Sequence, residues 1–415
     1  MHVTGLKCLK CGEEYPPQKM FEGCPQCRTD TFVSNVTVMY DEKLADKIGR
    51  KTFEDRGNTM WEYLELLPVD KENIVSLSEG GTPLHSKNMK ELGLKNLFLK
   101  DETRNPTWSF KDRLCSAALS KAKEFKAQTV TIASTGNHGA STAAYSARAG
   151  IPCVIFTTPD VPFTMKGLMQ IYGAKVVAAP ALKERWIIMR KCIKEFDWYP
   201  TGNYSLPIVG SNPYGIEGYK TIAFELCQQL DWQPPDYVVM PVGYADGITG
   251  VWKGFKEFYD LGLIDSKPKM VAVEVIGPLT NALEKGLEYP EELRFRETVA
   301  FSIGTNITPY QGLKTIRESK GLATTVSDEK IIEMQKILGK EGLYVETASA
   351  AAVAGVKTLV SQGKIEEDAK IVAVLTSTGL KDPVSTKRIL PEVPVITPEI
   401  SQLRKALKET YDYEF

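Results

Sequence analysis

The feature that most constrains the fold is an alternation of strand-like and helix-like segments that begins near residue 96. Short apolar runs suited to β-strands lie at residues 96–99, 129–133, 153–156, 175–178, 237–240, 271–275 and 371–375. Between them lie segments with helical apolar spacing, such as residues 182–196. This alternation predicts an α/β fold in which helices cover both faces of a parallel sheet.

Composition places the chain among ordinary globular proteins and excludes several other classes. Of its 415 residues, 43% are hydrophobic and 25% are charged, which excludes wholesale disorder and a collagen-like fibre. The formal net charge of −1 gives no basic excess, so nucleic acid is not an expected partner. No apolar run approaches the roughly 20 residues that span a bilayer, and the N-terminus has no signal-peptide pattern. We therefore expect a cytoplasmic protein of two or three domains without a membrane partner.

Two Cys-x-x-Cys pairs stand near the N-terminus, Cys8 with Cys11 and Cys24 with Cys27. Their spacing is typical of a closed, tetrahedral, all-thiolate zinc site. The surrounding segment is poor in apolar residues, and a metal can supply the stabilisation that so small a core cannot. A redox dithiol is the competing interpretation, but such a site needs one Cys-x-x-Cys pair at the start of a helix and not two pairs on turns. The pattern predicts a structural zinc ribbon over residues 1–45.

Segment 105–113, Asn-Pro-Thr-Trp-Ser-Phe-Lys-Asp-Arg, precedes an apolar helical face. Ser109 and Asp112 have the spacing of a capping box, which places Lys111 in the first helical turn. The helix dipole disfavours a cation there, so Lys111 is a candidate for a neutral, nucleophilic amine or a Schiff base. An exposed lysine on a solvated helix end explains this segment more simply when it is taken alone.

Two glycine-containing turns each follow an expected strand and open an expected helix. They are residues 134–139, Ser-Thr-Gly-Asn-His-Gly, and residues 241–249, Pro-Val-Gly-Tyr-Ala-Asp-Gly-Ile-Thr. The backbone N–H groups of such a turn can bind an anion, although the same turns also occur for purely structural reasons. The GxGxxG dinucleotide fingerprint and the P-loop are both absent from the sequence.

Taken together, these segments resemble the threonine synthase branch of the fold-type II pyridoxal-phosphate enzymes, some of which also carry an N-terminal cysteine ribbon. The matching segments, in the same order along the chain, are residues 79–84, 105–113, 134–137, 218–221, 241–243, 346–355 and 375–382. The resemblance implies two open parallel-sheet domains of the tryptophan synthase β type, with the cofactor between them. The large cofactor domain would comprise residues 46–106 and 213–415, and the small inserted domain residues 107–212.

The resemblance also implies which residues hold the cofactor and the substrate. Lys111 would bond covalently to pyridoxal phosphate and would move the α-proton of the substrate. Asn137 would contact the phenolic oxygen of the cofactor, and Thr376 would lie at its pyridine nitrogen, which suits elimination and replacement. The residues of the turn that would bind the cofactor phosphate are Gly243, Tyr244, Ala245, Asp246 and Gly247. The residues that would receive the substrate carboxylate are Ser134, Thr135, Asn137 and His138.

Three departures from the family pattern concern the substrate and the phosphate turn. Members that act on O-phosphohomoserine bind its phosphate with an Asn-Ser pair and an arginine, whose positions here are Val209, Gly210 and Gly215. An arginine is a planar, bidentate donor to a dianion, so its loss predicts an uncharged distal pocket. Asp246 replaces a small residue, and it must either face away from the cofactor phosphate or shift the turn. Trp108 also replaces a small residue, and it either narrows the substrate pocket or fills core.

Three functions are therefore open. The favoured function is a pyridoxal-phosphate-dependent lyase that removes the α-proton of a small, unphosphorylated amino acid and then eliminates or replaces a substituent, as serine or threonine dehydratases do. The second is threonine synthase proper, which converts O-phosphohomoserine and water into threonine and phosphate. The third is a non-catalytic binding protein that kept the fold, against which the intact Lys111, Asn137 and Thr376 argue. Family members are often homodimers, so we expect a homodimer.

Overall fold

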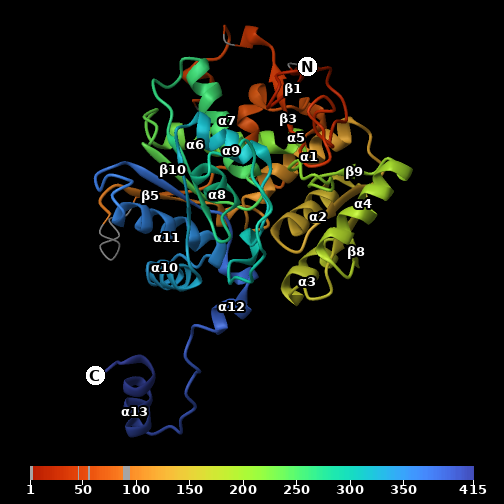
Figure 1. The fold of residues 1–415 in the computed structure, drawn as a ribbon. Coiled ribbons are helices and arrows are strands. Elements are labelled where there is room, and N and C mark those ends of the chain that lie inside the picture. The colour runs from red at the N-terminus through yellow and green to blue at the C-terminus, as the bar shows by residue number, and fades with distance from the viewer. Residues whose placement is uncertain (1–2, 45, 55–56, 87–93) are drawn as a thin grey trace. The chain divides into compact units, whose positions relative to one another are not determined.

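One mainly parallel β-sheet, one parallel β-sheet and one small antiparallel sheet organise the chain (Figure 1). The structure is a computed structural model that describes residues 3–44, 46–54, 57–86 and 94–415. Residues 1–2 and 45 of the predicted ribbon, and residues 55–56 and 87–93 of the predicted large domain, lie outside the described residues. By its internal contacts the chain divides into residues 1–381, which contain all three sheets, and residues 382–415.

The larger sheet has six strands in the order β12-β11-β10-β13-β5-β4, and all are parallel except β4. The strands are β4 (Leu84–Ser86), β5 (Leu97–Asp101), β10 (Tyr237–Pro241), β11 (Lys269–Glu274), β12 (Leu322–Thr325) and β13 (Ile371–Leu375). The helices around this sheet include α6 (Lys220–Gln229), α7 (Asp246–Asp260), α9 (Tyr310–Glu318), α10 (Asp328–Lys340) and α11 (Thr347–Ser361).

Alternate residues of β10 enter two separate hydrophobic cores. Val238 and Met240 pack in the core shared with α6, α7 and α9, whereas Tyr237 and Val239 pack in the core shared with α10 and α11. Successive side chains of a strand point to opposite faces, so the sheet is covered on both sides. A strand buried on both faces needs a nearly continuous apolar run, which is the pattern in the sequence. The predicted α/β fold is therefore confirmed.

The smaller sheet has four parallel strands in the order β8-β7-β6-β9. The strands are β6 (Val130–Ala133), β7 (Cys153–Thr157), β8 (Lys175–Ala178) and β9 (Tyr199–Pro200). They alternate along the chain with α1 (Lys111–Glu124), α2 (Asn137–Ala149), α3 (Phe163–Ile171) and α4 (Leu182–Phe196), of which α2 and α4 contact both β6 and β7. The bounds of β8 and α4 are those expected from the sequence, β6 and β7 each differ by one residue at one end, and β9 was not expected.

The N-terminal ribbon is an antiparallel sheet of three strands in the order β2-β1-β3. Its strands are β1 (Val3–Cys8), β2 (Glu14–Tyr15) and β3 (Val36–Tyr40). The buried side chains of Leu6, Val36 and Val38 pack with Tyr214 of the short helix α5 (Pro213–Ile216). The ribbon therefore packs directly on the segment that leads into α6.

Residues 58–68, whose apolar residues have helical spacing, contain the 3₁₀ helix η3 (Met60–Leu66). Thr59 caps its start by accepting from the Trp61 N–H, and the helix is interrupted at Tyr63 (φ −96°, ψ 29°). Leu67 is already extended, as a residue before proline usually is.

The remaining elements among the described residues up to 381 are α8 (Pro278–Glu284) and short 3₁₀ turns. These turns are η1 (Glu42–Leu44), η2 (Arg50–Phe53), η4 (Lys71–Asn73), η6 (Glu102–Arg104), η7 (Glu217–Tyr219), η8 (Phe301–Ile303) and η9 (Gly379–Lys381). Residues 382–415 contain α12 (Pro383–Lys387) and α13 (Ile400–Tyr411). Within the described residues, no helix has both the length and the apolar character needed to cross a membrane.

Candidate functional site

Lys111 is the first residue of α1, and the backbone before it is tied to the end of β13. The Phe110 N–H donates to the Thr376 carbonyl oxygen (2.9 Å), and Ser109 forms a β-bridge with Ser377. The Lys111 Nζ lies 4.7 Å from the centroid of the Phe110 ring, and within the described chain no ion pair involves this lysine. Burial lowers the pKa of Lys111, against the opposing field of Asp246. The amine is therefore more often neutral and nucleophilic, as a Schiff-base lysine requires.

The predicted capping box of Ser109 and Asp112 is wrong. Phe110 precedes the helix without a side-chain cap. The Asp112 carboxylate accepts instead from the Thr107 N–H (2.6 Å), the Thr107 hydroxyl (2.5 Å) and the Ser141 hydroxyl (2.6 Å). Burial raises the pKa of Asp112 to about 6 although these donors oppose the shift. The carboxylate therefore joins the start of α1 to α2 instead of closing its own helix end.

Trp108 adopts a left-handed backbone conformation (φ 59°), and its side chain is 43% exposed. A side chain with this exposure does not fill core, which removes one of its two expected roles. A positive φ is costly for a bulky residue and persists only where the surroundings fix it. Narrowing of the substrate pocket by Trp108 stays a prediction.

Asn137, the first residue of α2, forms hydrogen bonds with three residues of two other segments. Its Oδ1 accepts from the Lys381 ammonium (2.8 Å) and from the Ser377 hydroxyl (3.2 Å), and its Nδ2 donates to the Glu346 carboxylate (3.0 Å). Burial lowers the pKa of Lys381 to about 8, although Asp112 and Glu346 oppose this shift. The structure thus brings Asn137 beside the end of β13, and its contact with a cofactor oxygen stays a prediction.

Thr376 is held by a serine on α11. The Thr376 hydroxyl lies 2.9 Å from the Ser349 hydroxyl, which also accepts from the Ser377 N–H (2.8 Å). All three side chains are buried. Ser349 therefore fixes where the Thr376 hydroxyl points.

Ser134, Thr135 and His138 lie at the start of α2, where the sequence predicts a site for the substrate carboxylate. The Ser134 hydroxyl accepts from the Gly136 N–H (3.2 Å) and the Gly139 N–H (3.0 Å) and so orders this turn. The Nε2 of His138 is buried and has no hydrogen-bond partner among the described residues. Burial, followed by the charge of Lys111, lowers the pKa of His138 well below its usual value. The imidazole is therefore uncharged at neutral pH.

The turn from Gly243 to Gly247 joins β10 to α7 and packs against the start of α1. Ala245 takes a left-handed conformation (φ 58°) that aims the chain into the helix. A Cβ at Gly247 would lie 2.6 Å from the Phe110 Cε2, so only glycine fits this close approach. The N-terminus of α7 presents backbone N–H groups of the kind that bind phosphate, and the turn therefore fits the group that the sequence predicts there.

Donors from two other segments hold the Asp246 carboxylate. Its carboxylate accepts from the Ser211 N–H (2.9 Å), the Ser211 hydroxyl (2.6 Å) and the Gln311 side-chain amide (2.7 Å). The charge of Asp246 is therefore satisfied by Ser211 and Gln311. That Asp246 faces away from the cofactor phosphate stays a prediction.

The positions at which the resemblance places a substrate phosphate offer no side-chain donor here. Val209 is apolar and buried, and Gly210 has no side chain. A Cβ at Gly215 would lie 3.1 Å from both the Ala118 Cβ and the Leu114 Cγ, so α1 occupies the space of a longer residue. The residue types at these positions cannot bind a phosphate, and packing leaves little space for a longer side chain at Gly215.

Arg185 of α4 is a buried cation that the sequence analysis missed. Its side chain is only 6% exposed, its Nε donates to the Leu182 carbonyl oxygen (3.2 Å), and no described carboxylate forms an ion pair with it. Burial lowers the pKa of Arg185, and Tyr244 and Asp160 oppose this shift. The neighbouring Trp186 ring packs edge-on against Tyr244 at a centroid distance of 6.2 Å. Helix α4 thus brings a guanidinium group toward the turn that contains Tyr244.

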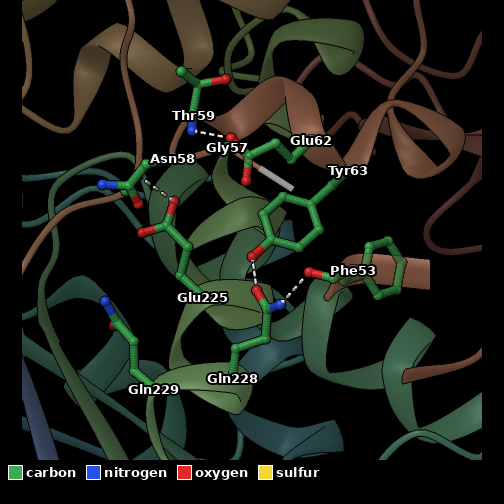
Figure 2. Close-up of a pocket in the computed structure, with 10 residues that line it drawn as sticks. Phe53, Gly57, Asn58, Thr59, Glu62, Tyr63, Glu225, Gln228 and Gln229 are labelled. Atoms are coloured by element: carbon green, nitrogen blue, oxygen red, sulfur yellow. Dashed lines mark hydrogen bonds between the residues drawn. The ribbon is translucent and has the colours of Figure 1, made fainter. Parts of the chain in front are cut away.

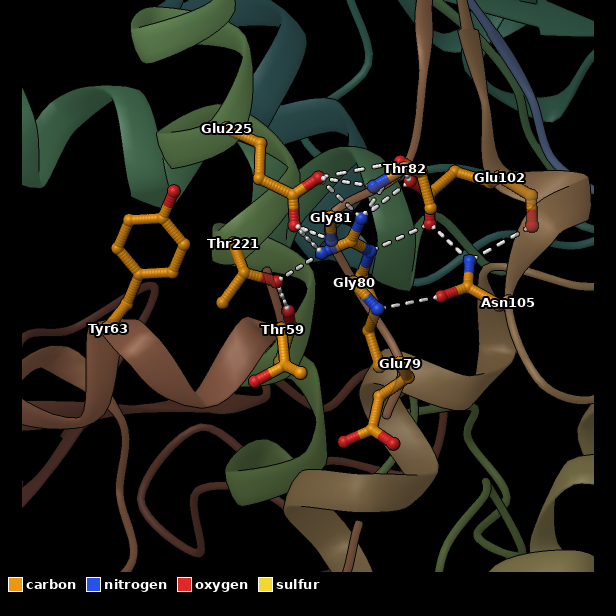
Figure 3. A network of polar contacts seen from close by, with 12 residues as sticks. Thr59, Tyr63, Glu79, Gly80, Gly81, Thr82, Glu102, Asn105, Thr221 and Glu225 are labelled. Atoms are coloured by element: carbon orange, nitrogen blue, oxygen red, sulfur yellow. Dashed lines mark hydrogen bonds and ion pairs between the residues drawn. The ribbon is translucent and has the colours of Figure 1, made fainter. Parts of the chain in front are cut away.

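A buried ionic network supports α1 from beneath (Figure 3). Arg113 binds Glu102 (2.7 Å) and Glu225 (2.5 Å), and Lys100 binds the second oxygen of Glu225 (2.6 Å). All four side chains are almost completely shielded from solvent. Arg113, two residues after Lys111, therefore anchors the start of α1 to Glu102 and Glu225.

A small polar cavity of about 130 Å³ borders this network (Figure 2). Its lining includes Glu225, Gln228 and Gln229 of α6 together with Tyr63 and Asn58. The Gln228 amide is already bonded to the Tyr63 hydroxyl and the Phe53 carbonyl oxygen. None of the predicted site residues lines this cavity, so it is separate from the candidate site.

The four N-terminal cysteines converge as their spacing predicts. The Sγ atoms of Cys8, Cys11, Cys24 and Cys27 all lie within 4.8 Å of one another. Although burial raises it, hydrogen bonds from Ser34 and from nearby backbone N–H groups bring the pKa of Cys8 down to about 7, toward the thiolate form that binds a metal. The donor set fits a tetrahedral all-thiolate zinc site.

Several residues around the candidate site were not predicted. Lys381, Glu346 and Ser349 lie inside segments that matched the family, so the sequence held a signal for them. Gln311 and Arg185 lie outside those segments, and only the tertiary structure brings them near the turn.

Comparison with known proteins agrees with this geometry. The family model described as "Pyridoxal-phosphate dependent enzyme" matches residues 75–377. Threonine synthase of Methanocaldococcus jannaschii is 40% identical over 97% of this chain and 99% of its own, and that of Methanosarcina acetivorans is 37% identical over 97% and 98%. The structure of the processed form of threonine deaminase isoform 2 from Solanum lycopersicum shares the fold, with a TM-score of 0.64, 22% identity, and coverage of 80% of this chain and 92% of its own.

Proposed function

Because the chain belongs to the family of pyridoxal-phosphate-dependent enzymes, and is a carbon–oxygen lyase of that family, we propose that its substrate is a small amino acid without a phosphate group. The enzyme would remove the α-proton and then eliminate or replace a substituent on the side chain. The reaction class follows from the family, and the choice of substrate is our proposal.

This choice of substrate rests on the three positions where the resemblance places a substrate phosphate, because none of them offers a side-chain donor. Val209, Gly210 and Gly215 supply no donor, and Leu114 and Ala118 fill the space beside Gly215. A dianion buried without cationic partners is strongly unfavourable. A short, uncharged side chain avoids that penalty.

We assign the site residues as the sequence predicted them. Bound pyridoxal phosphate supplies the electron sink that makes the α-proton acidic. Lys111 would hold the cofactor and move that proton, and the turn Gly243–Gly247 would bind the cofactor phosphate. Asn137 and Thr376 would contact the cofactor ring, with Thr376 oriented by Ser349.

The substrate carboxylate would bind at the start of α2, where Ser134, Thr135, Asn137 and His138 lie. The ordered turn around Ser134 supports this assignment, because a fixed set of N–H groups binds a carboxylate without further reorganisation. The uncharged His138 would contribute through its backbone N–H and not as a general acid.

Threonine synthase is the second candidate, and two observations favour it. Relatives with that name match nearly the full length of this chain. In addition, Arg185 is a buried guanidinium without an ion-pair partner in the described structure, and it could receive a phosphate that Gly215 cannot. Lys253 is not available for this role, since it is bound to Glu217 (2.5 Å) and to the Val38 carbonyl oxygen (2.6 Å).

Four further assignments are proposals of the same kind. Zinc would occupy the four-cysteine site. The large domain would comprise residues 46–106 and 213–415, and the small domain would comprise residues 107–212. A homodimer is proposed from the resemblance to the family, and the cytoplasmic location expected from the sequence stays a proposal.

A steady-state assay of the purified enzyme separates the two candidates. The substrates are serine, threonine, their O-activated analogues and O-phosphohomoserine, and products are detected as 2-oxo acid, released leaving group or threonine. Our proposal expects turnover of an unphosphorylated amino acid and weak turnover of O-phosphohomoserine. Efficient release of phosphate from O-phosphohomoserine, with serine and threonine inert, would replace it by the threonine synthase reaction.

A further inference from the structure

The cysteine ribbon reaches the Gly243–Gly247 turn through two buried amide side chains. Asn35, directly before β3, donates through Nδ2 to the Gln311 Oε1 (3.0 Å) and to the Ser211 carbonyl oxygen (3.2 Å). Gln311 of α9 donates through Nε2 to the Asp246 carboxylate (2.7 Å), to which Ser211 also donates. All four residues are buried. A continuous chain of hydrogen bonds therefore links the ribbon to the first residue of α7.

The chemistry of these groups fixes the direction of the chain. A carboxylate only accepts hydrogen bonds, so Gln311 must present its Nε2 to Asp246 and its Oε1 to Asn35. Asn35 must then present its Nδ2, because a reversed amide would place two oxygens in contact. Gly210 (φ 110°) passes beside both amides, and a Cβ there would lie 2.7 Å from the Gln311 Nε2. A side chain at position 210 would therefore collide with these amides.

We propose that Asn35 and Gln311 are positioning residues that hold Asp246, and with it the Gly243–Gly247 turn, in the conformation that binds the cofactor phosphate. This inference rests on the proposed role of that turn. Asp246 is the first residue of α7, and a carboxylate at a helix start is attracted to the free N–H groups there. Without the Gln311 donor, only the Ser211 N–H and hydroxyl hold the carboxylate. The carboxylate is then less restrained from approaching the free N–H groups, where it competes with the phosphate and repels it.

The test is cofactor affinity in Asn35→Ala, Gln311→Ala and the double variant. Titration of cofactor-free enzyme with pyridoxal phosphate should give a dissociation constant about tenfold higher for Gln311→Ala, the size expected for one lost hydrogen bond to a charged group. Asn35→Ala should show a smaller rise. The double variant should resemble Gln311→Ala alone, because Asn35 acts on Asp246 largely through Gln311.

Two control variants separate positioning from general loss of packing. Gln335→Ala removes a buried amide of α10 that donates to the Val345 carbonyl oxygen (2.8 Å). This amide forms no hydrogen bond with Asn35, Gln311 or Asp246. Lys7→Ala breaks the exposed ion pair with Glu14 on the ribbon surface. Both controls should leave cofactor affinity within twofold of wild type.

Hydrogen exchange of the turn supplies a readout that needs no cofactor. In cofactor-free protein, the N–H groups of residues 243–247 should exchange faster in both test variants than in wild type and in the two controls. Wild-type affinity together with wild-type exchange in Asn35→Ala and Gln311→Ala overturns the inference. If wild type binds no pyridoxal phosphate, the proposed phosphate-binding role of the turn fails. The hydrogen-exchange rates of residues 243–247 still decide whether Asn35 and Gln311 position the turn. Unchanged metal content in Asn35→Ala would show that the ribbon is intact.

Discussion

Replacement of Glu225 by glutamine tests the buried network beneath α1. The Glu225 carboxylate is 5% exposed and accepts from Arg113, Lys100 and the Gly81 N–H (2.9 Å). Glutamine keeps the size but removes the charge, which leaves two buried cations with Glu102 as their remaining counter-ion. Loss of one partner from a buried ion pair destabilises a protein by about 3–5 kcal/mol. We expect a loss of that size in the free energy of unfolding at neutral pH.

The assay is urea unfolding of cofactor-free protein, followed by circular dichroism and by tryptophan fluorescence to detect separate transitions. The matched control is Glu292→Gln, which breaks an ion pair with Lys183 whose side chains are 59% and 44% exposed. Exposed pairs contribute about 0–1 kcal/mol. Losses for the two variants that agree within about 1 kcal/mol would refute the argument from burial.

The pH dependence gives a second check on Glu225. Although burial raises it, the charges of Arg113 and Lys100 bring the pKa of Glu225 far below its usual value. A carboxyl group with a depressed folded-state pKa contributes stability that is present above its unfolded pKa of about 4.3 and is lost as pH falls below it. The difference between wild type and Glu225→Gln should therefore be constant above roughly pH 5 and shrink in more acidic solution.

Three further predictions concern the candidate site and the ribbon. Borohydride reduction of the holoenzyme should label Lys111, and Lys111→Ala should abolish turnover; a label on another lysine, found by peptide mapping, contradicts the assignment. Cys24→Ser should remove the metal measured by elemental analysis and lower the unfolding temperature, whereas a metal-free wild type of equal stability argues against a zinc site. Arg185→Gln should raise KM for O-phosphohomoserine at least tenfold if that is the substrate, since a charge-assisted contact is lost, and should leave KM for serine nearly unchanged; an equal effect on both substrates would point to a structural role.

The sequence alone was sufficient for features that depend on local pattern or spacing. The apolar run at residues 237–240 is continuous because β10 is buried on both faces, and it therefore indicated a strand of a parallel sheet before any contact was known. The paired cysteines converge because two short knuckles can meet without help from the rest of the chain. Local spacing misled at Ser109 and Asp112, where Thr107 and Ser141 offered the carboxylate better donors than its own helix end.

Only the tertiary structure decided what surrounds the Gly243–Gly247 turn. The sequence showed Asp246 at an unusual position, but not that Ser211 and Gln311 hold its carboxylate. Asn35 and Gln311 stand 276 residues apart and share no spacing rule, so their contact exists only because the ribbon packs beside α9. Arg185 looked like one charge among several on an amphipathic helix, and its burial depends on the neighbours that folding brings to it. Hydrogen bonds and desolvation between distant segments are set by the packing of whole elements, and the local order of residues does not encode them.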